Sequence, residues 1–279
     1  MKIFQAMYRI ALRFLFIFFL ISFVFTSTLS AGCSRSSASL IIAGSTSVQP
    51  FAEVLAEAYM ILHPGITIDI QGGGSAAGIM ATQSGTTNIG MSSRVLAGNE
   101  TSLWSVEIAR DGIAIIIYPD NPIINLTLPQ VRDIYSGKIT DWSQIGGKKS
   151  EIHVFTREDG SGTRSSFESL VMGKTEIMAR AMVQDSNGAI RQLVGDDPYA
   201  IGFISLGLVD KTVKAVELDG VIPSREHVID DTYNLSRPFL FLTLKEPTGL
   251  AKDFIDFTLS DKGKQILYDQ GLVITGVNP

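Results

Sequence analysis

The residues best suited to chemistry lie in one short stretch, Thr156–Arg164, which reads Thr-Arg-Glu-Asp-Gly-Ser-Gly-Thr-Arg. Its Arg157 offers a planar guanidinium that suits an oxyanion, and Ser161 and Thr163 add hydroxyl donors. The two glycines let the backbone come close to a ligand. This combination of residue types predicts an anion-binding loop.

The elements around this stretch would aim it at an anion. A strand-like run, Glu151–Phe155, precedes it, and a helix-like run begins near Ser165. A strand, a polar turn and a helix direct backbone N–H groups and the positive helix end toward one place. An N-capped helix after a tight turn, without any ligand, explains this one loop about equally well.

Two further loops of the same kind lie upstream, and they make the ligand-free alternative less attractive. Gly44-Ser45-Thr46-Ser47 follows an apolar strand-like run, Leu40–Ala43, and precedes a helical pattern with Pro50 in its first turn. The second loop, Gln71–Gly78, contains Ser75 and follows the alternating run Ile66–Ile70. The sequence therefore predicts several hydroxyl-rich turns, each between a strand and a helix.

Two stretches of the sequence partly match nucleotide-binding motifs, but each lacks a residue that its motif requires. Gly72, Gly74 and Ala77 fit a dinucleotide fingerprint, but the acid expected about 20 residues later is missing. Gly173-Lys174-Thr175 resembles the end of a phosphate-binding P-loop, but Glu168 stands where its first glycine is required. Both nucleotide-binding interpretations are rejected.

Composition excludes other classes of function. The 279 residues carry a net charge of −5. The first 32 hold Lys2, Arg9 and Arg13 and no acid, so the remaining 20 basic and 28 acidic residues give −8. A net-acidic chain is a poor candidate for nucleic acid binding. One cysteine allows no internal disulfide, and three scattered histidines predict no metal site and no cofactor.

The N-terminus resembles a bacterial lipoprotein signal. A basic segment, Met1–Arg13, precedes the apolar run Phe14–Leu29 and then Ser30-Ala31-Gly32-Cys33. We expect a signal peptide over 1–32, lipidation of Cys33 with diacylglycerol and palmitate-type chains, and a flexible tether over 33–40. An ordinary secretory signal and an uncleaved membrane anchor remain as alternatives, and both also leave the chain outside the cytoplasm.

The periodicity of the remaining chain favours an α/β fold. Strand-like runs alternate with helical patterns, including the buried run Asp111–Tyr118, the strands Ala200–Ser205 and Pro238–Leu242, and an amphipathic helix over Ala251–Tyr268. Such alternation implies a mainly parallel sheet, and ligand loops then lie at the carboxyl ends of its strands.

These motifs together resemble the phosphate-binding lipoproteins of bacterial phosphate ABC transporters, within the type II periplasmic-binding-protein superfamily. The resemblance covers nearly the whole mature chain. The matching stretches are 44–50, 71–79, 88–94, 126–142, 156–164, 186–190, 200–207 and 233–238.

The resemblance implies two α/β domains with mixed, mainly parallel sheets, two crossover segments near Tyr118 and Arg237, and a ligand cleft between the domains. Domain I would comprise 41–117 plus 238–279, and domain II would comprise 118–237. The protein would be a monomer and not an enzyme, and it would capture inorganic phosphate and deliver it to the permease and ATPase of an ABC transporter.

The resemblance also carries a set of site residues. Phosphate would be held by Ser45, Thr46, Ser47, Ser75, Ser93, Arg157, Ser161, Gly162 and Thr163. Asp159 would position Arg157, and Arg94 would lie beside the site. Many relatives have an aspartate where this chain has Ser93, and that aspartate accepts the proton of the bound phosphate. We therefore expect weaker exclusion of sulfate here.

Two alternatives stay open. The same fold could bind another tetrahedral oxyanion, such as sulfate or molybdate. A secreted serine hydrolase is the less favoured interpretation, because Ser75 lies in a loose nucleophile-elbow pattern but neither His153 nor His227 has a supporting motif.

Overall fold

The computed structural model describes residues 38–274, which belong to a single unit. The predicted signal peptide and Cys33 lie outside the described residues. Strand β1 (Ala38–Gly44) already begins at Ala38, so the last three residues of the expected tether, 38–40, are strand. None of the helices between residues 38 and 274 has the length and apolar content that crossing a bilayer requires.

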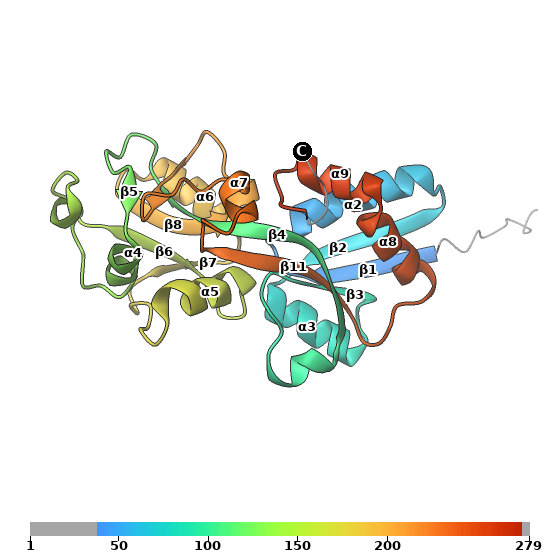
Figure 1. Ribbon diagram of the computed structural model, residues 1–279. Coiled ribbons are helices and arrows are strands. Elements are labelled where there is room, and N and C mark those ends of the chain that lie inside the picture. Colours follow the sequence, from blue (N-terminus) through green and yellow to red (C-terminus); the bar gives the residue numbers. More distant parts are fainter. Residues whose placement is uncertain (1–37, 275–279) are drawn as a thin grey trace, which may run out of the picture. The chain divides into compact units, whose positions relative to one another are not determined.

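One mixed sheet runs through this unit, with strand order β2-β1-β3-β11-β4-β8-β6-β7 and β9 beside β4 (Figure 1). Both ends of the sheet are parallel, since β1 pairs with β2 and β3, and β6 pairs with β7 and β8. The middle is antiparallel, where β11 pairs with β3 and β4, and β4 pairs with β8 and β9. The strands are β2 (Ile66–Gly72), β3 (Ile89–Ser92), β4 (Trp104–Ile117), β6 (His153–Arg157), β7 (Met182–Gln184), β8 (Ala200–Ser205), β9 (Lys214–Ala215) and β11 (Ser236–Thr243), while β5 (Asn125–Leu126) and β10 (Glu217–Leu218) pair separately.

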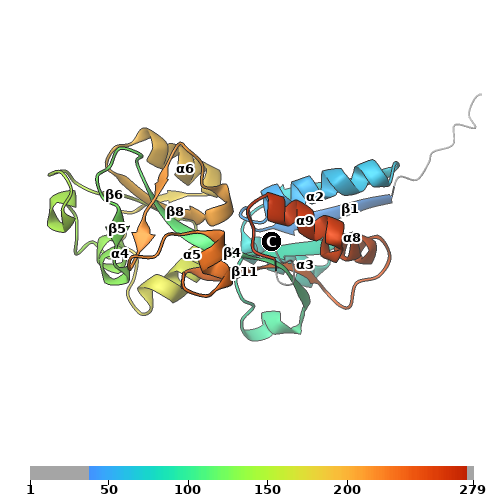
Figure 2. The same ribbon diagram turned by 45° about the horizontal axis from the view of Figure 1, so that its top comes forward.

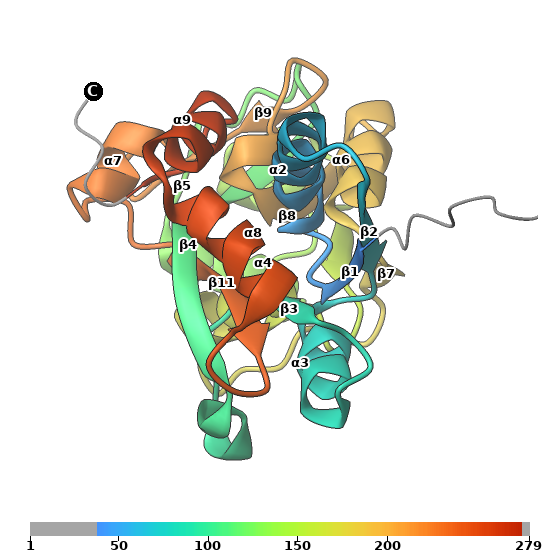
Figure 3. The same cartoon turned by 90° about the vertical axis from the view of Figure 1, so that its right-hand side faces the viewer.

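The helices connect these strands and cover both faces of the sheet. They are α2 (Gln49–Leu62), α3 (Ser75–Ser84), α4 (Leu128–Tyr135), α5 (Gly162–Phe167), α6 (Asn187–Asp196), α7 (Arg225–Ile229), α8 (Gly249–Leu259) and α9 (Asp261–Asp269). Short helical turns are η2 (Gly98–Ser102), η3 (Trp142–Ile145), η4 (Glu168–Met172) and η5 (Leu206–Leu208). Figures 1 and 3 show α2, α8 and α9 on one face of β1 and α3 on the other.

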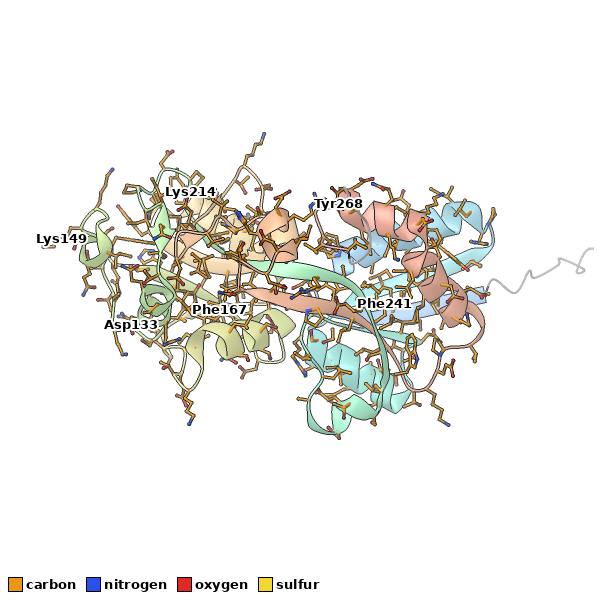
Figure 4. The ribbon with its side chains drawn as sticks, in the orientation of Figure 1. Asp133, Lys149, Phe167, Lys214, Phe241 and Tyr268 are labelled. Carbon is orange, nitrogen blue, oxygen red and sulfur yellow. The ribbon has the colours of Figure 1, made fainter. Side chains whose placement is uncertain are left out.

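Two large hydrophobic clusters lie along the sheet. One packs α2 and α8 onto β1, β3 and β11 and includes Phe241 and Phe254. The other packs α4 and α5 onto β4, β6 and β8 and includes Phe167, which stacks on Phe203. Phe241 and Phe167, labelled in Figure 4, mark the two clusters. Strand β4 passes from one cluster to the other (Figure 2) and contributes residues to both, Ile108 and Ala109 to the first and Ile113, Ile115 and Ile117 to the second.

The predicted fold class is confirmed, and several element boundaries need correction. Strand β4 begins at Trp104, seven residues before the expected start at Asp111, because it pairs with β11 along its first half. The helix expected over Ala251–Tyr268 is two helices, since Ser260 ends α8 and caps α9 through its side chain. The helix expected near Ser165 begins earlier, at Gly162.

The hydroxyl-rich turns lie where the sequence predicted them, at the carboxyl ends of strands. Ser45–Ser47 follow β1, Ser75 follows β2, and Ser93 follows β3. The Arg157–Ser161 turn follows β6, and Ser186 follows β7 and caps α6 by accepting a hydrogen bond from the N–H of Ala189. The sheet thus brings turns distant in sequence toward one another.

Candidate anion-binding site

Three serine hydroxyls from the turns after β1, β2 and β3 meet in the interior. Ser45 Oγ donates to Ser93 Oγ at 2.8 Å, and Ser75 Oγ lies 3.3 Å from Ser93 Oγ. The backbone N–H of Ser93 donates to Ser75 Oγ at 3.0 Å. All three residues are buried, so these hydroxyls form a polar cluster shielded from solvent.

A second hydroxyl pair joins the turn after β1 to the start of α5. Ser47 Oγ and Thr163 Oγ1 lie 2.7 Å apart, and both residues are buried. Asn187, the first residue of α6, donates from Nδ2 to Ser47 Oγ at 2.9 Å. Its Oδ1 accepts the N–H of Ser205, which fixes the orientation of the amide.

Arg157 lies beside these hydroxyls at the end of β6 and is 1% exposed. Its Nε donates to Glu158 Oε2, and its Nη2 donates to Glu158 Oε1 and to Thr46 Oγ1, each at 2.9 Å. Nη2 and Nε also donate to the carbonyls of Asp185 and Gln184. Within residues 38–274, Nη1 is buried and has no hydrogen-bond partner. A guanidinium nitrogen left in this state is a donor available to an anion.

The N-termini of three helices converge on the same cluster. Ser75 begins α3, Gly162 begins α5 and Asn187 begins α6. The first backbone N–H groups of a helix lack intrahelical partners, and the helix dipole makes this end positive. A Cβ at position 162 would overlap the hydroxyls of Ser75 and Ser93, so the close approach of these turns requires glycine there.

A buried ion pair lies behind Ser93. Arg237 on β11 is 3% exposed and donates from Nε and Nη2 to Asp111 Oδ2 on β4, at 3.2 and 3.0 Å. Its Nη1 donates to Ser93 Oγ at 3.4 Å and to the Ser93 carbonyl at 3.5 Å. Burial lowers the pKa of Arg237 and raises that of Asp111, while Arg157 also acts to lower the pKa of Arg237.

The predicted site residues largely come together. Ser45, Ser47, Ser75, Ser93 and Thr163 form the buried hydroxyl cluster, Arg157 contacts Thr46, and Gly162 packs on Ser75 and Ser93. Ser161 caps α5, because its Oγ accepts the N–H of Arg164. Whether these residues contact a ligand stays a prediction.

The role predicted for Asp159 is wrong. Its side chain is 94% exposed and pairs with Arg164 at 2.7 Å. Glu158 pairs with Arg157 instead, and its side chain is 28% exposed. The turn after β6 directs the acid adjacent to Arg157 back onto its guanidinium and turns the next one outward.

Arg94 does not contact the hydroxyl cluster. It pairs with Glu100, with both guanidinium Nη atoms bonded to the carboxylate at 2.7 and 2.8 Å. Both residues line a cleft of about 450 Å³ whose lining also includes Ser166 and Arg237, two residues that are hydrogen-bonded to Ser93. Arg94 is thus committed to its own loop.

Sequence reasoning missed three residues that hold the hydroxyls in place. Asn187 lies within the 186–190 stretch that the sequence singled out, but its side-chain amide was given no role there. Asp111 and Arg237 were assigned to a buried strand and to a crossover. Their partners are distant in sequence, and only the antiparallel pairing of β4 with β11 brings them together.

The histidines available to a hydrolase have other partners. His153 Nδ1 lies 2.6 Å from Asp197 Oδ2, and His227 Nδ1 lies 2.8 Å from the carbonyl of Ile222. In the part of the chain that the structure describes, no histidine is hydrogen-bonded to Ser75, and no group of three or more His, Cys, Asp or Glu side chains is arranged to hold a metal ion.

The chain is similar to a superfamily model and to known proteins. Residues 30–262 match the model of the PBP superfamily domain. The phosphate-binding protein PstS of Bacillus subtilis strain 168 is 33% identical over 248 residues, which is 87% of this chain and 82% of that protein.

Two solved structures are similar as well. One is from Clostridium perfringens, contains bound phosphate and is described as a phosphate ABC transporter substrate-binding protein; it is 44% identical, with a TM-score of 0.82, over 84% of this chain and 98% of that chain. An ABC-type phosphate transport receptor from Vibrio cholerae is 41% identical, with a TM-score of 0.72, over 84% of this chain and 99% of that chain.

Proposed function

The chain belongs to the PBP superfamily and, within it, to the family of the phosphate-binding protein PstS, and from this premise we propose that it binds inorganic phosphate and delivers it to an ABC-type permease. The proposed ligand groups are Arg157, Gly162, Thr163 and the hydroxyls of Ser45, Thr46, Ser47, Ser75, Ser93 and Ser161. The protein captures its ligand without chemical change, in keeping with relatives that are named as binding proteins.

The observation that carries this proposal is the unbonded Nη1 of Arg157. A buried cationic donor without a partner is costly, and an oxyanion would satisfy it with a charge-assisted hydrogen bond. The surrounding hydroxyls and the starts of α3, α5 and α6 supply neutral donors and positive helix ends. Because Glu158 balances the charge of Arg157, the charge of a bound anion is stabilised chiefly by these hydrogen-bond donors and helix ends.

The site lies between residues assigned to different domains by the proposed division. Ser47 belongs to the 41–117 segment and Thr163 to 118–237, and their hydroxyls are 2.7 Å apart. The start of α3 is likewise bonded to the turn after β6, through the Ala76 N–H and the Gly160 carbonyl. We propose that domains 41–117 plus 238–279 and 118–237 close on phosphate, so that these contacts accompany ligand capture.

The test of phosphate binding is native mass spectrometry of the mature protein purified without added ligand. We expect a mass excess equal to one phosphate per chain, and its loss after partial unfolding and exchange into phosphate-free buffer. The stripped protein should then bind one phosphate in titration calorimetry. A stripped, folded protein that gives no heat with phosphate contradicts the proposal.

We also propose that the protein acts outside the cytoplasm as a monomer anchored by a lipid on Cys33. The basic segment, the apolar run and the small residues before Cys33 support this. More than one acyl chain is needed for stable anchoring. Replacing Cys33 by Ala should stall processing or release the mature protein into the soluble fraction. Normal cleavage with full membrane retention would contradict lipidation at this residue.

A further inference from the structure

Several hydroxyls of the site share one feature: they accept a hydrogen bond from a donor in the surrounding protein. Thr46 accepts from Arg157 Nη2, Ser47 from Asn187 Nδ2, and Ser75 from the N–H of Ser93. A hydroxyl has one hydrogen to donate and two lone pairs that accept. A donor that occupies one lone pair therefore directs the O–H bond away from itself and leaves the hydrogen to another acceptor.

Ser93 is the most fully constrained of these hydroxyls. Its Oγ accepts from Ser45 Oγ at 2.8 Å and from Arg237 Nη1 at 3.4 Å. These two bonds occupy both lone pairs, so the hydroxyl has only its hydrogen left to offer. The nearest other partner, Ser75 Oγ, can accept this hydrogen or leave it to a ligand.

Arg237 is itself held in place. Its Nε and Nη2 are bonded to Asp111 Oδ2, and Asp111 Oδ1 accepts from Ser205 Oγ at 2.8 Å. The fork geometry of a guanidinium lets it bond to the carboxylate on one side and to Ser93 on the other. If Arg237 only balanced the charge of Asp111, its contact with Ser93 would not be needed.

We propose that Arg237, fixed by Asp111, is a positioning residue that makes Ser93 a hydrogen-bond donor to the bound anion, so that the site recognises phosphate by its oxygens and charge and not by its proton. This inference rests on the proposed phosphate-binding function. It assigns to Ser93 the role of donor, which excludes the role of proton acceptor.

The carboxylates near the site agree with this assignment. Within residues 38–274, no carboxylate oxygen is hydrogen-bonded to Ser45, Ser47, Ser75, Ser93 or Thr163. Glu158 is bonded to Arg157, Asp111 is bonded to Arg237, and Asp159 is exposed. A site that reads a substrate proton can reject an analogue without it by roughly 10⁴–10⁵. We therefore expect the dissociation constant of sulfate to exceed that of phosphate by much less than this factor.

The first experiment measures the dissociation constants of phosphate and sulfate for the unmodified protein and for Ser93→Ala. If Ser93 donates, both anions lose the same bond and weaken by the same factor, about 10-fold. If Ser93 accepts the phosphate proton, phosphate weakens and sulfate does not, which overturns the inference. A folded protein that binds neither anion contradicts the proposed function instead.

The second experiment tests Arg237 through the ratio of the sulfate to the phosphate dissociation constant. Combining Asp111→Asn with Arg237→Gln removes the charges together and withdraws the donor behind Ser93. Ser93 can then accept from phosphate but still only donate to sulfate, so we expect the ratio to rise several-fold. Adding Ser93→Ala should abolish this rise. An unchanged ratio in the folded double variant would mean that Arg237 serves structure alone.

Two further variants keep this test decisive. Arg237→Lys retains the charge beside Asp111, but an ammonium lacks the fork that spans to Ser93, so the ratio should rise here too. The matched control is Arg110→Gln with Asp231→Asn. This ion pair comes from the residue next to Asp111 on β4, whose side chain points to the opposite face of the sheet. The control should leave the ratio unchanged.

Discussion

Two buried arginines in this molecule are paired with acids yet serve different purposes. Arg157 is 1% exposed and Arg237 is 3% exposed. Arg157 bonds to Glu158 with Nε and Nη2 and leaves Nη1 unbonded. Arg237 bonds to Asp111 with the same two atoms, and its Nη1 is used by Ser93. The difference lies in one nitrogen.

This difference teaches that burial and pairing do not by themselves identify a ligand-binding arginine. A ligand-binding arginine is identified by a buried side-chain nitrogen that has no hydrogen-bond partner within the protein. Arg157 has one nitrogen without a partner and is the last residue of β6, whereas every side-chain nitrogen of Arg237 has a partner and the residue lies within the strand pair β4–β11. We therefore expect substitution of Arg157 to reduce mainly phosphate affinity and substitution of Arg237 to reduce mainly stability.

The largest expected effect is on stability. Arg237→Leu leaves the Asp111 carboxylate buried and unpaired, which typically costs about 3–5 kcal/mol. Replacing both residues, Arg237→Leu with Asp111→Leu, should recover most of that loss because no charge then remains buried. Urea unfolding measures both. A loss of less than about 1 kcal/mol for Arg237→Leu would show that Asp111 does not depend on its partner.

The second effect is on binding. Arg157→Ala removes a charge-assisted donor worth about 1.5–3 kcal/mol, so phosphate affinity should fall about 10- to 100-fold. Stability should change less than for Arg237→Leu, because Glu158 is 28% exposed and can be hydrated once its partner is gone. Calorimetry and circular dichroism report the two properties. An unchanged affinity in a folded variant would remove Arg157 from the site.

The smallest effect concerns Arg94, whose side chain is 16% exposed, against 1% for the side chains of Arg157 and Arg237. The hydrogen bond from Arg94 lowers the pKa of Glu100 below its ordinary value of 4.5. The stabilisation is therefore complete above pH 4.5 and is lost as pH falls through the lower pKa of the folded state. We expect at most about 1 kcal/mol.

The measurement for this pair is urea unfolding as a function of pH, with Glu100→Gln as the comparison. The difference in stability between the unmodified protein and the variant should shrink below pH 4.5. Phosphate affinity at neutral pH should be the same in both proteins, because Arg94 contacts none of the site hydroxyls. A large change in affinity in Glu100→Gln would contradict this separation of the Arg94–Glu100 pair from phosphate binding.

The sequence predicted the parts of the site that depend on local pattern. Each strand–turn–helix unit places its hydroxyls at a strand end, so Ser45, Ser75 and Thr163 could be identified from the order of residue types alone. Asp111 and Arg237 could not, because their pairing depends on strand register across 126 residues.

The prediction that Asp159 positions Arg157 failed for a different reason. Glu158 and Asp159 are adjacent and chemically alike, and only the backbone path of the turn decides which of them faces the guanidinium. The first half of β4 was a further miss: Trp104, Val106 and Ile108 alternate with Ser105 and Glu107 in the period of a strand, and β11 pairs with this half.

The central claim, that Arg157 Nη1 is a donor for a bound anion, is tested most directly by a crystal structure of the mature protein with phosphate. The account predicts a phosphate oxygen about 2.7–2.9 Å from Nη1, with the hydroxyls of Ser93 and Thr163 around the same ion. A phosphate bound elsewhere, with Nη1 still unbonded, would contradict it.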